Sequence, residues 1–216
     1  MFGILLLTAC ATTNVNRDID NLMHRYDGPV PGAALLVLRD GKPLVARGYG
    51  YADVATRVPV TPRTNFRLAS VTKQFTAAAI LLLVEDGKLA LDDPLRKWLP
   101  SLPVEADAIT LRQLLTHTSG LVDYEDVMDP ADTRQVLDAD VLRLLEGEHR
   151  LYFAPGSQWR YSNSGYALLA LVVERASGMR FPEFLRTRIF APLGMNGTLA
   201  RQDGGPPVAN RAYGHS

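Results

Sequence analysis

The stretch "FRLASVTKQFTAAAILLLVEDGKL" (Phe66–Leu89) decides the fold and also raises the question of function. Its apolar run, Ala77–Val84, predicts a buried helix from about Ser70 to Asp86. Yet the first turn of this helix carries Lys73, three residues after Ser70. A lysine is unexpected at the start of a helix that belongs in a core, so its position calls for an explanation.

Ser70 and Lys73 are expected to be neighbours, because helical residues three apart share one face with Cβ atoms about 5–6 Å apart. The start of a helix favours developing negative charge. A serine hydroxyl becomes nucleophilic when a partner takes its proton, and an amine can do so when its surroundings lower its pKa from about 10.4. The alternative is that Ser70 only caps the helix and Lys73 extends to solvent. Spacing alone favours that alternative, since about one Ser-x-x-Lys match arises by chance in such a chain.

A second candidate segment is "APGSQWRYSNSGYALL" (Ala154–Leu169), in which Tyr161 and Asn163 precede an apolar helix predicted to begin near Ser164. A tyrosine phenol can transfer protons when nearby cations lower its pKa. An asparagine amide offers both a donor and an acceptor to a substrate. The alternative is a tyrosine packed on its ring and Asn163 acting as a helix cap, and for this pair alone that alternative is favoured.

The remaining pattern predicts two strands followed by about six helices. Ala33–Arg39 and Pro43–Gly50 are β-prone runs joined by Asp40-Gly41, which indicates a hairpin. Thr110 is expected to cap a short helix in "TLRQLLTH", and Gly178 to end the helix of the second segment. Because a lone hairpin is only marginally stable, its apolar face is expected to join a wider sheet or pack on helices.

Composition excludes several classes of function. The 216 residues fit one domain or two small interleaved ones, and 47% hydrophobic with 21% charged residues is typical of a globular protein. Lys and Arg number 23 and Asp and Glu number 23, so no nucleic-acid partner is predicted. No metal-ligand spacing is found around the four histidines, and no metal or cofactor is predicted. The chain has no Gly-x-Ser-x-Gly turn, which argues against an α/β-hydrolase.

The first ten residues, "MFGILLLTAC", resemble a bacterial lipoprotein signal. This interpretation predicts a signal peptide over residues 1–9, a lipid-anchored Cys10, a tether over residues 10–29 and a location in the periplasm or cell envelope. The alternative is a chance match, because the basic start of a signal peptide is missing and Arg17 is the first cationic residue. A single cysteine excludes a disulfide within the chain.

Four blocks follow one another in the order of one family: "FRLASVTKQFTAAAILLLVEDGKLALDDPLRKWLP", "ITLRQLLTHTSGL", "FAPGSQWRYSNSGYALLALVVERASG" and "IFAPLGM". They resemble serine β-lactamase-related hydrolases, namely class C β-lactamases, D-alanyl-D-alanine carboxypeptidases and related esterases. The resemblance runs from about Pro31 to Thr198. It implies an α+β fold of the β-lactamase/transpeptidase type over residues 30–216, an antiparallel sheet flanked by helices with a mostly helical region, about 92–180, inserted.

The resemblance also implies roles for the candidate residues. Ser70 would be the acylated nucleophile, and Lys73 would help to deprotonate it. Tyr161 would pass protons to the leaving group and activate the hydrolytic water, while Asn163 would hold the substrate and contact Lys73. The backbone N–H of Ser70 would form half of an oxyanion hole, a contribution of about 3–4 kcal/mol per donor in comparable sites.

One family motif has no match in this sequence. The family carries Lys- or His-[Ser/Thr]-Gly on a strand near its C-terminus, whereas "HTSG" (His117–Gly120) lies between the first two motifs. We therefore interpret His117 as a packing and hydrogen-bonding residue. The sheet is expected to be incomplete, as in a C-terminally truncated family member, and a polypeptide ending at Ser216 is expected to be poorly folded and weakly active or inactive.

The sequence thus predicts a serine hydrolase that acts on a small-molecule amide or ester through an acyl-enzyme on Ser70. A β-lactam, a D-alanyl-D-alanine peptide and a small ester remain open as substrates. The alternative is a penicillin-binding or sensor module without turnover, or an inactive fragment of such a hydrolase. The oligomeric state is not predicted.

Overall fold

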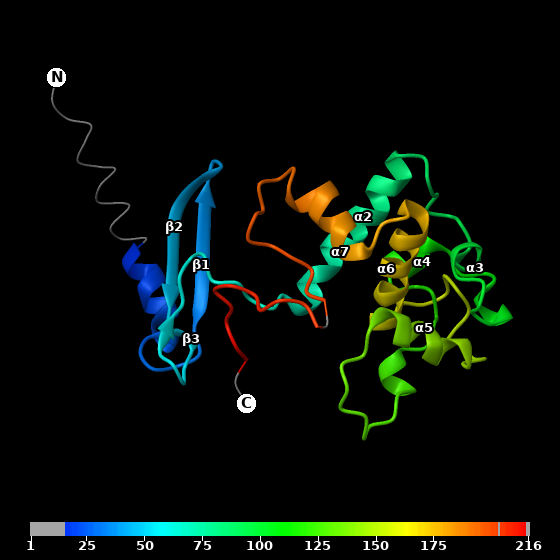
Figure 1. Cartoon of the computed structure of the whole chain (residues 1–216), viewed down its shortest axis with the longest axis horizontal. Coiled ribbons are helices and arrows are strands. Elements are labelled where there is room, and N and C mark those ends of the chain that lie inside the picture. Colours follow the sequence, from blue (N-terminus) through cyan, green and yellow to red (C-terminus); the bar gives the residue numbers. More distant parts are fainter. Residues whose placement is uncertain (1–15, 203, 215–216) are drawn as a thin grey trace. The chain divides into compact units, whose positions relative to one another are not determined.

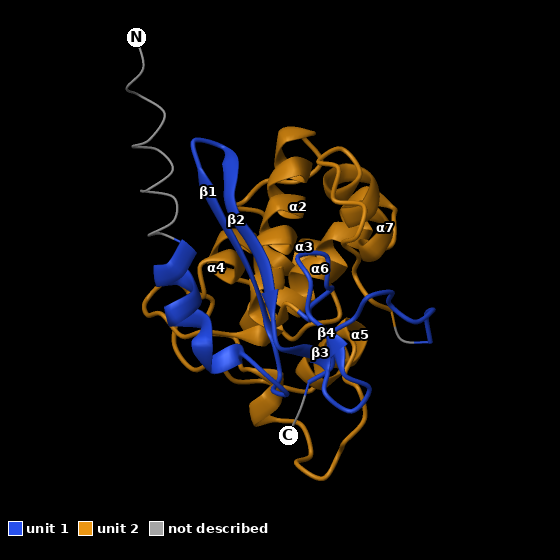
Figure 2. Ribbon diagram, turned by 90° about the vertical axis from the view of Figure 1, so that its left-hand side faces the viewer, with its two compact units in different colours: residues 1–67, 204–216 blue, residues 68–203 orange. Residues whose placement is uncertain are grey.

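The computed structural model describes residues 16–202 and 204–214. The chain divides into two compact units, residues 1–67 with 204–216 and residues 68–203, which Figure 2 shows in different colours. The predicted signal peptide over residues 1–9 and the predicted lipid attachment at Cys10 lie outside the described residues. The histidine at position 215 lies outside them as well. The predicted division between a tether over residues 10–29 and a folded domain over residues 30–216 stays a prediction.

The first unit contains the hairpin that the sequence predicts. After a helix over residues 16–23 and a 3₁₀ turn, η1 (His24–Tyr26), the strands β1 (Ala33–Arg39) and β2 (Lys42–Tyr49) pair antiparallel (Figure 1). Asp40 and Gly41 form the turn with φ values of +51° and +72°. Positive φ at both turn residues matches the right-handed twist of the flanking strands, which is why this dipeptide is a reliable hairpin signal.

A second two-stranded sheet follows directly, and the sequence did not reveal it. β3 (Tyr51–Asp53) pairs antiparallel with β4 (Val58–Pro59). Strands of three and two residues are too short to show an alternating pattern. The end of the chain returns to this unit, since the Tyr213 N–H donates to the Ala52 carbonyl at 2.8 Å.

Residues 68–203 form a helical unit whose core positions the candidate site. Its central helix α6 contacts α2, α4, α5 and α7. Fully buried side chains of α6, α2 and α7, such as Leu168, Ile80 and Phe184, hold these helices together. Each such side chain contributes roughly 1.5–3 kcal/mol on burial. The elements are η2 (Ala69–Thr72), α2 (Lys73–Glu85), α3 (Leu95–Trp98), η3 (Val104–Ala106), α4 (Leu111–Leu115), η4 (Tyr124–Asp126), α5 (Asp138–Glu146), α6 (Asn163–Ser177), α7 (Phe181–Leu185) and the π-helical turn η5 (Arg186–Phe190).

Local signals set several helix ends as predicted. The Thr110 hydroxyl accepts from the Gln113 N–H at 3.3 Å, and the Gln113 side chain accepts from the Thr110 N–H at 3.0 Å. This reciprocal pair satisfies two donors that α4 would otherwise leave without partners. Gly178 ends α6 in the left-handed conformation with φ of +72°. The α-helix of the Ser-x-x-Lys segment, in contrast, begins at Lys73, and Ser70 lies in the preceding 3₁₀ turn.

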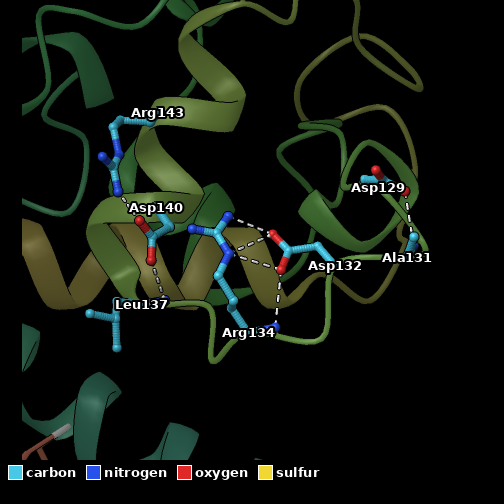
Figure 3. A network of polar contacts seen from close by, with 7 residues as sticks. All are labelled: Asp129, Ala131, Asp132, Arg134, Leu137, Asp140 and Arg143. Atoms are coloured by element: carbon cyan, nitrogen blue, oxygen red, sulfur yellow. Dashed lines mark hydrogen bonds and ion pairs between the residues drawn. The ribbon is translucent and has the colours of Figure 1, made fainter.

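The segment between η4 and α5 is ordered by contacts between residues close in sequence (Figure 3). The Asp132 carboxylate accepts from the Arg134 backbone N–H at 3.0 Å and from its guanidinium at 2.6–3.2 Å. At the start of α5, Asp140 accepts from the Leu137 N–H at 2.9 Å and also pairs with Arg143. The hydrogen bonds and charge of Arg134 lower the pKa of Asp132 from 3.8 to about 2.

Replacing Arg134 by Gln should raise the pKa of Asp132 toward 3.8, without reaching it, because the backbone N–H bond remains. Because the pKa of Asp132 is lower in the folded chain than its ordinary 3.8, the ionised carboxylate stabilises the fold above pH 3.8. This stabilisation is lost as the pH falls through about 2. An NMR titration of the Asp132 carboxyl carbon measures the shift. Arg143→Gln is the matched control and should leave the Asp132 titration unchanged; an unaltered Asp132 in Arg134→Gln would contradict the assignment.

Among the described residues, no helix combines the length and the apolar character needed to cross a membrane.

Candidate active site

The four predicted site residues lie together within the helical unit. Lys73 at the start of α2 donates from Nζ to the Ser70 Oγ at 3.3 Å and to the Asn163 Oδ1 at 2.7 Å. The Tyr161 hydroxyl lies 2.6 Å from the same Ser70 oxygen. Packing of α2 against α6 explains the proximity, since Lys73 begins one helix and Asn163 begins the other.

The backbone around Ser70 is unusual. Ala69, directly before it, has a φ of +46°, which non-glycine residues rarely adopt and which costs free energy that the surroundings must offset. Ser70 is exposed, and α2 has no side-chain cap. Lys73 is partly buried and hydrogen-bonded. Ser70 therefore does not cap α2, and the Lys73 side chain does not extend freely into solvent.

The Lys73 ammonium lies among polar and aromatic groups. Its Nζ is 4.7 Å from the centroid of the Tyr161 ring and 5.5 Å from that of Tyr166, which are cation–π distances. In the described part of the chain, no carboxylate lies within ion-pair distance of this ammonium. Its direct contacts are therefore with the serine and asparagine oxygens and with the two tyrosine rings.

The electrostatics favour ionisation of Tyr161. Partial burial raises the pKa of Tyr161, but hydrogen bonding to Lys73 and Ser70 and the charge of Lys73 together lower it below 10, while Asp123 opposes them. A phenol with a lowered pKa is a better proton acceptor near neutral pH than a free tyrosine. The Tyr161 phenolate can therefore remove a proton from Ser70 and pass it on to another atom.

Glu125 fixes the orientation of the Asn163 amide, and sequence reasoning missed it. The Asn163 Nδ2 donates to the Glu125 Oε1 at 3.0 Å, while the Asn163 Oδ1 accepts from Lys73. A carboxylate only accepts and an ammonium only donates, so the amide has one favourable orientation. No local spacing links Glu125 to Asn163, and no signal in the sequence could have identified the contact.

Asp123 is a second residue that the sequence reasoning missed. This carboxylate is 8% exposed, and it accepts from the backbone N–H groups of Asn163 at 2.5 Å, Ser164 at 3.4 Å and Glu125 at 3.3 Å. Negative charge at the start of α6 is favourable because the first N–H groups of a helix lack partners. The Ser162 hydroxyl caps the same helix through the Gly165 N–H at 3.2 Å, so Asn163 is not the cap.

His117 packs and forms hydrogen bonds, as predicted, and it does so beside the site. Its ring lies 4.7 Å from the Tyr161 ring and 5.2 Å from the Tyr166 ring, and its Nδ1 accepts from the Ser162 N–H at 3.2 Å. In the described residues, no group of three or more His, Cys, Asp or Glu side chains is arranged to hold a metal ion.

Comparison with known proteins gives consistent relatives. Penicillin-binding protein 4* of Bacillus subtilis (strain 168) is 38% identical over 197 residues, which cover 89% of this chain and 42% of that protein. The crystal structure of D-amino acid amidase from Ochrobactrum anthropi SV3, complexed with L-phenylalanine amide, superposes with a TM-score of 0.79 at 33% identity, covering 93% of this chain and 57% of that one. EstCE1, a hydrolase with promiscuous acyltransferase activity, gives a TM-score of 0.73 at 28% identity, covering 86% of this chain and 53% of that one.

The chain spans about two fifths of the length of the curated relatives it matches. Within that span the agreement extends over the sequence, the helices and the short antiparallel sheets. The beta-lactamase family model matches residues 15–215, which include every element described above. The predicted fold class is confirmed, and the chain belongs to the beta-lactamase family.

Proposed function

We propose that this chain provides the nucleophile and proton-transfer groups of a serine hydrolase that cleaves amide or ester bonds through an acyl-enzyme on Ser70. One observation carries the proposal. The Ser70 Oγ lies 2.6 Å from the Tyr161 hydroxyl and 3.3 Å from the Lys73 amine. A serine in contact with a phenol of lowered pKa that can take its proton, and with an ammonium that stabilises the resulting phenolate, has the arrangement that nucleophilic catalysis requires.

The proposed reaction has two steps. The phenolate of Tyr161, stabilised by Lys73, takes the Ser70 proton while the Oγ attacks the substrate carbonyl. Collapse of the tetrahedral intermediate breaks the bond to the leaving group, which receives that proton from Tyr161. In the second step Tyr161 takes a proton from water, the resulting hydroxide attacks the acyl carbon, and the proton returns to Ser70 as the acid is released.

The relatives support this reaction class and leave the substrate open. Their names describe an amidase, a hydrolase with acyltransferase activity and a penicillin-binding protein. All three descriptions are compatible with transfer of an acyl group to or from a serine. The identity of 38% to the penicillin-binding protein favours a second candidate, a module that is acylated by penicillin without rapid turnover.

Two probes separate these candidates. The full chain is incubated with a fluorescent penicillin and, separately, with a chromogenic short-chain acyl ester, and any adduct is located by peptide mass spectrometry. We expect an adduct on the peptide that contains Ser70. Rapid release indicates a hydrolase, and a persistent adduct indicates the binding module. Ester cleavage without a penicillin adduct indicates an esterase. A folded chain that forms its adduct on another residue, or neither reacts nor turns over, would refute the proposal.

Membrane attachment is a separate proposal that rests only on residues 1–10. Globomycin-sensitive processing at Cys10 in cells would support lipid anchoring at the cell envelope. Processing that is insensitive to globomycin, or no processing, would overturn it.

A further inference from the structure

His117 contacts four successive residues of the segment that carries Tyr161. The Trp159 ring meets the His117 ring edge-on at 6.1 Å, and the Arg160 N–H donates to the His117 carbonyl at 3.0 Å. The Tyr161 ring lies 4.7 Å away at an interplanar angle of 33°, and the Ser162 N–H donates to the His117 Nδ1 at 3.2 Å. One residue thus touches the whole segment that leads into α6.

The backbone conformation of His117 allows this one residue to make all of these contacts. Its φ of +60° is left-handed, a conformation in which histidine and asparagine are several-fold enriched among non-glycine residues. The same turn is tied to the following loop, since Thr118 accepts from the Gly156 N–H at 2.8 Å and Gly120 from the Tyr152 N–H at 2.7 Å. A Cβ on Gly120 would lie 2.0 Å from the Phe153 carbonyl oxygen, so this close approach needs glycine. The backbone that follows His117 is therefore held in place by hydrogen bonds and close packing.

We propose that His117 is a positioning residue for Tyr161, whose ring holds the phenol ring and whose Nδ1 holds the next N–H, so that the phenol oxygen stays within reach of Ser70. This inference rests on the proposed role of Tyr161 as the proton carrier. It also goes beyond that role, because it gives the "HTSG" segment a place beside the chemistry.

The contacts require a neutral imidazole. An Nδ1 that accepts from Ser162 leaves the proton on Nε2, and protonation of Nδ1 would set two N–H groups against each other. Burial first, and then the charge of Lys73, lower the pKa of His117 below 6.5, while Asp123 opposes them. The groups that face the imidazole are Lys73 of α2, Asp123 before η4, and Tyr161 and Tyr166 around the start of α6. Acidification below pH 6.5 should therefore release the Ser162 N–H and loosen Tyr161.

NMR of the full chain with ¹³C-labelled tyrosine and histidine tests this directly and needs no enzymatic activity. The Tyr161 signal, assigned by its loss in Tyr161→Phe, should shift with the same midpoint as the His117 ring, below pH 6.5. The Tyr51 signal is the control and should not follow that midpoint. A Tyr161 signal that does not respond while His117 titrates would overturn the inference.

Two variants separate the contribution of the His117 ring from that of its Nδ1 acceptor. His117→Asn tolerates the left-handed backbone and keeps an acceptor near Nδ1, but it loses the ring; His117→Phe keeps a ring and loses the acceptor. Each should slow penicillin acylation of Ser70 by about 10- to 100-fold, the loss that misplacement by about 1 Å can cause. In both variants, the Tyr161 signal should no longer shift near the pH at which His117 titrates in wild type. Acylation at the wild-type rate in His117→Asn would refute positioning. If wild type is not acylated, the proposed function fails and the titration still decides the positioning role.

Discussion

Replacing Ser70 by Ala should abolish acylation, and replacing Lys73 by Met should slow it about a thousandfold. Loss of the attacking oxygen removes the chemistry, and in a comparable serine hydrolase loss of the nucleophile costs about 10⁶-fold in kcat. Methionine nearly preserves the length of Lys73 but removes the charge that touches Ser70, Asn163 and the Tyr161 ring. General-base assistance contributes about 10²- to 10⁴-fold. The measurement is the rate constant for adduct formation with the penicillin probe.

The pH dependence of acylation in Lys73→Met shows why this variant reacts more slowly. In wild type, partial burial raises the pKa of Tyr161, but contacts with Lys73 and Ser70 together lower it below 10. Without Lys73, burial acts with less opposition, so the phenolate forms only at higher pH. The acylation rate of Lys73→Met should therefore begin to rise at a higher pH than the wild-type rate. An unshifted profile would mean that Lys73 does not act through the phenol.

Two exposed residues of the same unit provide matched controls. Ser101→Ala removes a hydroxyl from the turn after α3, and Lys88→Met removes an amine from the turn after α2. Both variants should react at the wild-type rate. Acylation of Ser70→Ala at that rate would reject the serine mechanism altogether.

Replacing Phe184 by Ala should lower the free energy of unfolding by about 3–5 kcal/mol. The Phe184 side chain is completely buried in the core that joins α7 to the central helices. Its removal forfeits the transfer free energy of the ring and leaves a cavity, because a close-packed interior relaxes only partly. A loss of this size is a large fraction of the 5–15 kcal/mol that stabilises a typical domain.

Denaturant unfolding measures this loss through the transition midpoint. Val104→Ala is the control, because Val104 is 65% exposed and a surface change of this kind alters stability by about 0.5 kcal/mol or less. A loss below about 1 kcal/mol for Phe184→Ala would place the phenyl ring outside the core.

The sequence predicts features whose cause lies within a few residues. Asp40-Gly41 indicates the hairpin because its backbone preferences match one turn type, and Thr110 indicates a helix start because its partner lies three residues on. Neighbouring placement of Ser70 and Lys73 follows from helical geometry. The short strands β3 and β4 escape prediction because two or three residues carry no period.

The contacts that complete the candidate site depend on tertiary structure. Asp123 and Glu125 reach the start of α6 only after α6 has packed, and a lone acidic residue in a loop carries no sign of such a partner. His117 is read correctly as a packing residue, but its place beside Tyr161 follows from a backbone conformation that no short motif specifies. Contacts between distant segments were supplied by resemblance to a family, and the residues alone did not reveal them.

The pair formed by Ser70 and Tyr161 has a consequence for biosynthesis, because 91 positions separate its members. Long-range contacts form late in folding, since the entropy of closing a large loop must be overcome first. At translation rates of about 5–20 residues per second, the ribosome needs roughly 5–18 s to make the intervening chain. Ser70 is therefore synthesised well before Tyr161, and on the nascent chain it lacks its proposed proton-transfer partner until the second segment emerges and docks.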